Sequence, residues 1–219
     1  MAGSVDQIDR PASLREKLAT ALRAELVTGR FEPAVVYSVP SLAERFGVSA
    51  TPVREAMLDL VNEGLVEAVP NKGFRLVELS DDDLDEIAEL RALVEIPVVV
   101  GLAGNLSSGD LQRLRGHAET IERAAAAGDL VGYIEADFRF HLDLLGLAGN
   151  RRLVGLVASL RAQARLDNLS RLAEKGVLIE SAREHAALLD ALVAGDARAV
   201  ERMMREHLGH VRGIWSAGR

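Results

Sequence analysis

The stretch LAERFGVSATPVREAMLDLVNEGLV, residues 42–66, decides the fold of the first third of the chain. Its first segment ends at Gly47-Val48-Ser49, a sequence typical of a tight turn. Its second segment runs to about Asn62, and Gly64 ends it. At 100° per residue, one side of this second segment collects the apolar residues Val53, Ala56, Met57 and Leu60. Two short helices joined by a tight turn are typical of a helix-turn-helix.

The flanking residues extend this motif in both directions. Ser13 and Glu16 have capping-box spacing ahead of leucines at helical intervals, so a helix is expected from there to Gly29. The stretch RFEPAVVYSVP, residues 30–40, is expected to be a loop, with Ser41 opening the next helix. Downstream, LVEAV and FRLVEL predict two strands around the turn PNKG, residues 70–73. Three helices followed by a hairpin indicate a winged helix-turn-helix domain over residues 10–79.

The remaining residues, 80–219, predict a second domain that is an all-helical bundle, so the chain is mainly α. The acidic run after Ser80 is a helix start, and strand patterns disappear beyond it. Pairs such as Gly128-Asp129 and Gly195-Asp196 combine a helix stop with the cap of the next helix. Helices are expected over about 83–103, 109–127, 129–147, 151–169, 177–194 and 196–215.

Composition narrows the function classes. The 219 residues include no cysteine, which excludes disulfides, thiolate metal sites and thiol nucleophiles. The first residues lack an apolar signal segment, and the longest apolar run, IPVVVGLAG, is too short to cross a bilayer, so a cytoplasmic protein is expected. Net charge is −7, whereas residues 10–77 hold nine Lys and Arg against eight Asp and Glu. DNA contacts would therefore depend on a local cluster.

The outer face of the helix after Ser49 carries side chains suited to a DNA major groove. Arg54 can make bidentate hydrogen bonds to guanine or phosphate, and Thr51 can hydrogen-bond a phosphate or a base edge. Glu55 either accepts from cytosine or orients Arg54. The hairpin tip, Asn71-Lys72-Gly73, can reach the minor groove or its backbone. The alternative is that these residues are ordinary charges on the surface of a small helical domain.

Three of the five histidines fall on apolar helical stripes and so face the core: His141, His185 and His207. Asp137 shares the stripe of His141, one turn before it. Imidazole and carboxylate suit Zn, Ni, Mn or Fe(II), and four protein ligands would leave positions open for a carboxylate of a small molecule. The alternative is a set of core histidines with ordinary hydrogen-bond partners. His117 lies off its stripe and His210 lies at the edge of its own, so both are expected at the surface.

Arg91 also lies on an apolar stripe, with Glu95 one turn on. It can form a half-buried pair with Glu95, contact a second subunit, or clamp the carboxylate of a ligand. Arg161 and Arg165 are further candidates for the ligand clamp. The residues themselves leave these interpretations open.

The motif LAERFGVSATPVREAMLDLVNEGLV with the later NKGF resembles the DNA-binding domain of GntR-family bacterial transcription regulators. The helical half resembles the ligand-binding domain of the FadR-type subfamily, called FCD, so the two cover nearly the whole chain. The resemblance implies a homodimer, repressor or activator, that binds a palindromic operator and responds to a metabolite. In the family the turn commonly reads Ser-Arg-Thr-Pro-Val-Arg-Glu, and its first Arg reads a base. This chain has Ala50 there, whose methyl can instead meet a thymine methyl, so a different operator is expected.

The same resemblance implies a metal site in the helical domain. An Asp-x-x-x-His and two later histidines form such a site in FCD domains, and DFRFH, REHAALLDAL and REHL match it. This assigns Asp137, His141, His185 and His207 as ligands of a divalent ion (Zn, Ni or Mn), with His210 in reserve. The Arg91 and Glu95 pair also resembles the FCD pattern.

Two functions from different classes fit these patterns. The first is a transcription regulator of the repressor type, controlled by a small carboxylate bound at the metal site. The second is a metal-dependent enzyme that acts on a small carboxylate through the same four residues. The chain has no HExxH, no Ser-His-Asp order and no phosphate loop, and a winged helix has no evident use in an enzyme. We therefore expect that the chain is not an enzyme.

Overall fold

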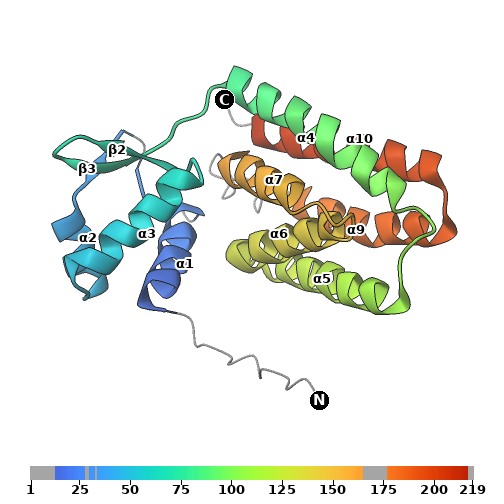
Figure 1. Ribbon diagram of the computed structural model, residues 1–219, viewed down its shortest axis with the longest axis horizontal. Helices are drawn as coiled ribbons and strands as arrows, with labels where there is room; N and C mark the ends of the chain where they lie inside the picture. Colours follow the sequence, from blue (N-terminus) through green and yellow to red (C-terminus); the bar gives the residue numbers. More distant parts are fainter. Residues whose placement is uncertain (1–12, 28–29, 33, 165–176, 217–219) are drawn as a thin grey trace, which may run out of the picture.

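The computed structural model describes residues 13–27, 30–32, 34–164 and 177–216. Its first part contains three helices and a small sheet, as the winged helix-turn-helix prediction requires (Figure 1). The bounds of these elements are α1 (Leu14–Val27), β1 (Val36–Tyr37), α2 (Val39–Phe46), α3 (Ala50–Asn62), β2 (Val66–Val69) and β3 (Gly73–Leu76).

The helix starts follow from short polar side chains that satisfy free backbone N–H groups. The Ser13 hydroxyl accepts from the Glu16 N–H at 3.2 Å, and Glu16 accepts from the Ser13 N–H at 2.7 Å, which is the expected capping box. The expected start of α2 at Ser41 is wrong. Ser38 is the cap and accepts from the Ser41 N–H at 3.2 Å, because Pro40 has no N–H to donate and its fixed φ suits the first turn.

The sequence predicts a loop over residues 30–40, but part of this stretch is a strand. Val36 and Tyr37 form β1, which pairs antiparallel with β3, with Val36 opposite Arg75 and Tyr37 opposite Phe74. The sheet order is therefore β1-β3-β2, and the hairpin gains a third strand. Two residues are too few to show the alternation by which a strand is recognised in a sequence.

The apolar side of α3 forms the core of this first part, as its periodicity predicts. Val53, Ala56, Met57 and Leu60 are fully buried, and they pack against leucines of α1 and α2. Burial of one such large side chain contributes about 1.5–3 kcal/mol. Arg15 pairs with Asp59, and Arg23 with Glu63, so two salt bridges also join α1 to α3. The core fixes α3 with its opposite side facing solvent.

The described regular elements of the second part are all helices, which confirms the predicted mainly α fold. The expected helix to residue 169 is described only to Ala164, because residues 165–176 lie outside the described ranges. No helix of the described residues has the length and apolarity needed to span a bilayer. The helices are α4 (Asp81–Gly101), α5 (Ser108–Ala127), α6 (Leu130–Gly146), α7 (Arg151–Ala164), α9 (Val177–Ala194) and α10 (Ala197–Ser216).

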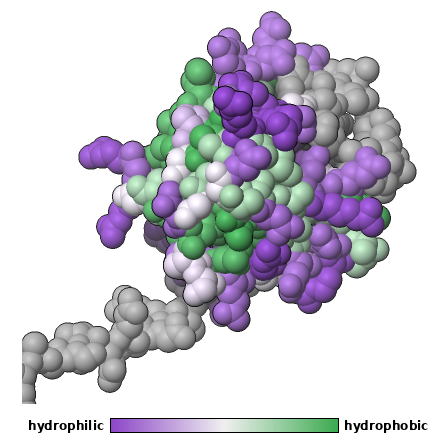
Figure 2. All heavy atoms as spheres, turned by 90° about the vertical axis from the view of Figure 1, so that its right-hand side faces the viewer, coloured by the Kyte–Doolittle hydropathy of each residue, from purple (hydrophilic) through white to green (hydrophobic). Residues whose placement is uncertain are grey.

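These helices pack around one apolar core that includes Phe140, Leu144 and Leu189, all fully buried. Helix α4 lies along α10, and α6 lies between α5 and α7 (Figure 1). Viewed from the bundle end distant from the sheet, polar side chains surround a smaller group of apolar ones (Figure 2). The α6, α9 and α10 helices bring separate parts of the sequence together inside the bundle, which is where the candidate site lies.

Candidate functional site

The start of α3 presents the side chains that the sequence assigns to DNA. Ser49, Ala50, Thr51, Arg54 and Glu55 are all exposed. The Ser49 side chain makes no capping hydrogen bond, so its hydroxyl remains available to a phosphate. Within the described residues Arg54 has no ion pair, and Glu55 does not pair with it, so the idea that Glu55 orients Arg54 gains no support. This surface offers one unpaired guanidinium beside the positive end of a helix.

The hairpin tip is built as a tight turn. Asn71 has a φ of 61°, and the Lys72 N–H donates to the Val69 carbonyl at 3.0 Å. Gly73 has a φ of 144°, and a Cβ there would meet the Tyr37 carbonyl oxygen at 2.1 Å, so only glycine fits. The turn leaves Asn71 and Lys72 exposed, which suits contact with a DNA backbone.

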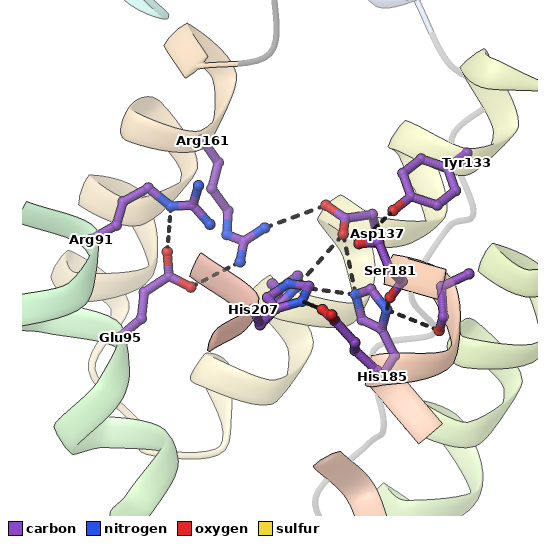
Figure 3. Close-up of polar contacts among 11 residues, drawn as sticks. Arg91, Glu95, Tyr133, Asp137, Arg161, Ser181, His185 and His207 are labelled. Atoms are coloured by element: carbon purple, nitrogen blue, oxygen red, sulfur yellow. Dashed lines mark hydrogen bonds and ion pairs between the residues drawn. The ribbon is translucent and has the colours of Figure 1, made fainter. Parts of the chain in front are cut away.

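Inside the bundle, the four predicted metal ligands converge. Asp137 and His141 come from α6, His185 from α9 and His207 from α10, and one ligand atom of each lies within 4.8 Å of all the others. The His141 Nε2 is 3.2 Å from the His185 Nε2 and 3.1 Å from the His207 Nε2. The His185 Nε2 is also 3.2 Å from the Asp137 Oδ1. All three histidines are buried, and Figure 3 shows His185 beside Asp137.

The outer ring nitrogens of two of these histidines determine where their protons lie. The His185 Nδ1 is 3.1 Å from the Ser181 carbonyl and 3.2 Å from that of Ala182, so it must carry the hydrogen. The His207 Nδ1 lies 2.6 Å from a carboxylate oxygen of Glu184 and donates to it. Each Nε2 then presents a lone pair toward the centre of the cluster. Such outer partners are typical of histidines that bind metal ions.

The centre of the cluster therefore has more lone pairs than hydrogens. The Nε2 of His185, the Nε2 of His207 and the Oδ1 of Asp137 are all acceptors, while a neutral His141 can offer one hydrogen at most. A cation among them satisfies every acceptor. Neighbouring ligands at about 2.1 Å from an ion are about 3.0 Å apart in an octahedral shell and about 3.4 Å apart in a tetrahedral one. The observed nitrogen separations of 3.1 and 3.2 Å fit that range.

A chain of charged side chains leads from the cluster to α4. Arg161 of α7 lies 3.3 Å from Asp137 and 2.9 Å from Glu95, and Arg91 lies 2.7 Å from Glu95 (Figure 3). The Arg91–Glu95 pair is fully buried rather than half-buried, with 5% of the Arg91 side chain and 0% of the Glu95 side chain exposed. Both guanidiniums keep one N–H group without an acceptor among the described residues, at Arg91 Nη2 and Arg161 Nε.

Burial and charge set the protonation of these groups. Burial lowers the pKa of His141 well below its usual value, and Arg161 lowers it further. Burial also lowers the pKa of His207, although Glu184 opposes this shift. For Glu95, burial alone would raise the pKa, but Arg161 and Arg91 outweigh it and hold that pKa below its usual value. His141 and His207 are therefore neutral and Glu95 is charged. Neutral imidazole and ionised carboxylate are the forms that bind metal ions.

The remaining candidates lie outside this cluster. His117 is partly buried rather than on the surface, and its Nε2 lies 3.0 Å from Asp143. The side chain of His210 and all of Arg165 lie outside the described residues. The sequence did not single out Glu184, Ser181 or Tyr133, whose hydroxyl donates to that of Ser181 at 3.2 Å. In the sequence, Tyr133 lies one helical turn before Asp137, and Ser181 lies one turn before His185. Glu184 is adjacent to His185. These spacings are the only signals that could have indicated the three residues.

Comparisons with known proteins now place the chain. Residues 14–76 match the family of bacterial regulatory proteins described as the gntR family, and residues 86–210 match the FCD domain. The chain belongs to the GntR family of regulators with an FCD domain. The regulator LutR of Bacillus subtilis is 30% identical to it, over 82% of this chain and 90% of LutR. McbR of Escherichia coli is 29% identical, over 89% of both chains.

Solved structures of GntR regulators share its fold. Escherichia coli McbR has a TM-score of 0.79 and 27% identity, over 94% of this chain and 99% of McbR. A GntR regulator from Rhodococcus has a TM-score of 0.74 and 25% identity, over 95% of this chain and all of that one. These relatives are transcriptional regulators rather than enzymes, so this FCD-type protein is a DNA-binding regulator, and the metal-dependent enzyme gains no support.

Proposed function

We propose that this GntR regulator represses transcription as a cytoplasmic homodimer on a palindromic operator, with residues 10–79 binding DNA and residues 80–219 forming the effector-binding and dimerisation domain. The DNA contacts come from Arg54, with Ser49, Ala50, Thr51 and Glu55 around it on the start of α3. The wing residues Asn71, Lys72 and Gly73 contact the adjacent minor groove or its backbone. Exposure of all these residues except the partly buried Gly73, over a buried inner face of α3, supports the assignment.

We further propose that Asp137, His141, His185 and His207 hold one divalent ion. The single observation that carries this proposal is the convergence of three lone-pair acceptors on His141, which can satisfy only one of them. Zn, Ni and Mn all accept such a set of nitrogen and oxygen ligands. When bound, the ion supplies open coordination positions for the effector, and the protein residues hold it in place.

The charges around the site favour an effector that is a small carboxylate with a second acceptor group. Histidines that bind an ion must be neutral and so add no charge, and the charges of Arg91, Arg161, Glu95 and Asp137 cancel. A divalent ion therefore leaves this buried region positive, and Glu184 at its edge compensates only part of that charge. One end of the effector would bind the ion, and the other would accept from the unused N–H groups of Arg91 and Arg161.

Effector binding requires the bundle to move. The cavity beside His141, His185 and His207 has a volume of about 10 Å³, which is room for about one water. A carboxylate metabolite can enter only if the surrounding helices separate. The effector would also have to reach Arg161 of α7 and Arg91 of α4, and α4 follows directly after the DNA-binding part of the chain. Because the effector binds only after this displacement, its affinity differs between the closed and the displaced arrangement of the helices. Regulation requires such a difference in affinity.

The test uses the operator and small carboxylates together. DNA fragments retained by the purified protein are sequenced, and release of the selected operator is then measured with malate, citrate, lactate and their amides. We expect a carboxylate to change operator affinity only in metal-loaded protein, and the amide to have no effect. Arg91→Lys should raise the effector concentration needed while metal content stays at one ion per chain. Operator release that is indifferent to metal would contradict the proposal.

A further inference from the structure

A second cavity lies between the two parts of the chain. Its volume is about 600 Å³, within the roughly 300–1,000 Å³ range of small-molecule sites. Helix α1 and the end of α3 form one wall, and α6 and α7 form the other. The parts touch at its edge, where Gly64 lies against the side chain of Gln163 and Ala162 packs against the core of the DNA-binding part.

The α7 wall is hollow because its residues are small. Gly155, Ala158 and Ala162 line the cavity at helical spacing, and nothing lies within 4 Å of a Cβ added to Gly155. Across from them, Ile134 and Phe138 of α6 provide apolar and aromatic surface. The α6 and α7 walls of the cavity therefore suit a ligand with a flat apolar group.

Charges occur in the wall as balanced pairs. Arg23 of α1 is paired with Glu63 through two hydrogen bonds, at 2.9 and 2.5 Å. Arg139 lies 3.6 Å from Glu135, and both are well exposed. The pKa of Arg23 is raised mainly by Glu63 and more weakly by Glu135 across the cavity. Two cations and two anions leave no net charge to attract an ionic ligand.

The same two helices also form the metal centre. On α6, Asp137 belongs to the metal cluster and the next residue, Phe138, lines the interdomain cavity. On α7, Arg161 binds Asp137 and the next residue, Ala162, lines the cavity. A shift of either helix therefore changes both places, and a molecule in the cavity contacts the DNA-binding part directly through Arg23 and Leu65.

We propose that this interdomain cavity is a second ligand site, separate from the metal centre, for an uncharged amphiphilic molecule with an aromatic or aliphatic body. Its occupant fixes the orientation of the DNA-binding part relative to the bundle. Because the two halves of an operator must be met at a set spacing, that orientation changes operator affinity. The site goes beyond the carboxylate response, and only its effect on DNA rests on the operator binding proposed above.

The test uses Nile red, an uncharged aromatic dye that fluoresces in apolar surroundings, on the full-length protein. Wild type should bind one dye per chain and change operator affinity about fivefold or more at saturation. Gly155→Phe should weaken dye binding at least about tenfold by filling the cavity. Gly116→Phe is the matched control, because Gly116 is also an exposed helical glycine with nothing within 4 Å of an added Cβ, and it should bind dye as wild type does.

Two further variants make the outcome decisive. Ala158→Leu fills the same cavity by less and serves if Gly155→Phe does not fold. His185→Ala should keep dye binding while it loses the ion, so failure of the metal proposal and failure of this one are distinguishable. Non-saturable dye binding, equal binding by Gly155→Phe and Gly116→Phe, or an operator affinity unmoved by saturating dye would overturn the proposal.

Discussion

The Nε2 atoms of His141 and His207 face each other at 3.1 Å, while the Nδ1 of His207 donates to Glu184. The lone pair of His207 therefore points at His141, and His185 directs its own lone pair at the same atom. An apolar core with ordinary histidines would separate these nitrogens or place donors between them. The arrangement is the one that a cation requires, and it leads to a measurable metal content.

We expect wild type purified without chelator or affinity tag to contain one divalent ion per chain. His185→Ala should lose the ion, whereas Asp137→Asn should weaken it less, because an amide oxygen still coordinates but brings no charge. His117→Ala, outside the cluster, should keep it. Elemental analysis measures the content, and Zn or Ni should raise the melting temperature of metal-free wild type because only the folded form binds the ion. Metal well below one per chain with no thermal shift would leave these residues as core hydrogen-bond partners.

Glu95 should be much more important for stability than an exposed carboxylate. It is fully buried between Arg91 and Arg161, so Glu95→Gln leaves two buried guanidiniums without their shared anion. We expect the free energy of unfolding to fall by about 3–5 kcal/mol. Glu201→Gln, in the exposed pair with Arg205, should cost under about 1 kcal/mol. Urea denaturation of both variants checks this, and equal losses would show that the Glu95 pairs are not a structural unit.

The sequence predicted most of this structure where periodicity and caps are strong. The stripes on α6, α9 and α10 already placed Asp137 and the histidines on core-facing sides, and the structure brings them together. Strand β1 was missed because two residues show no alternation. Glu184 was missed because its role depends on α9 lying beside α10, a tertiary relation that no local pattern contains. The interdomain cavity depends likewise on how two separately folded cores meet.

Arg54 should carry specific DNA binding. It is exposed at the start of α3 and has no ion pair among the described residues, so its removal leaves the core intact. We expect Arg54→Ala to abolish retention of the selected operator with little change in melting temperature. Arg198→Ala, also an exposed arginine, should retain it. Non-specific binding should remain. If Arg54 contacts a phosphate, the slope of its log affinity against log salt concentration should fall by about one per subunit. Unchanged retention by Arg54→Ala would contradict the placement of α3 in the groove.

Ala50 should determine part of the operator sequence. Its methyl group is exposed one residue before Thr51, so it can contact a thymine methyl but cannot donate to guanine. Ala50→Arg should therefore select a different base pair at one position in each half-site, with a preference of about 1–3 kcal/mol for guanine there. Selection from randomised DNA compares the two proteins directly. Identical consensus sequences would mean that residue 50 lies outside the groove.

The metal-free protein should lose stability as pH falls below about 6.5, the ordinary pKa of histidine. Burial lowers the pKa of His141 and His207 in the folded state, so the unfolded chain takes up protons in this range while the folded chain does not. The free energy of unfolding then falls with falling pH, by up to about 1.4 kcal/mol per pH unit for each such histidine. The lowered pKa of Glu95 acts separately, below the ordinary carboxylate pKa of about 4. Urea denaturation in chelator at pH 7.5 and 5.5 measures the difference. His207→Gln removes one of the two titrating groups and should reduce the difference, whereas His117→Ala should not reduce it. If His207→Gln has the same pH dependence as wild type, His207 takes up its proton equally well in the folded and unfolded states.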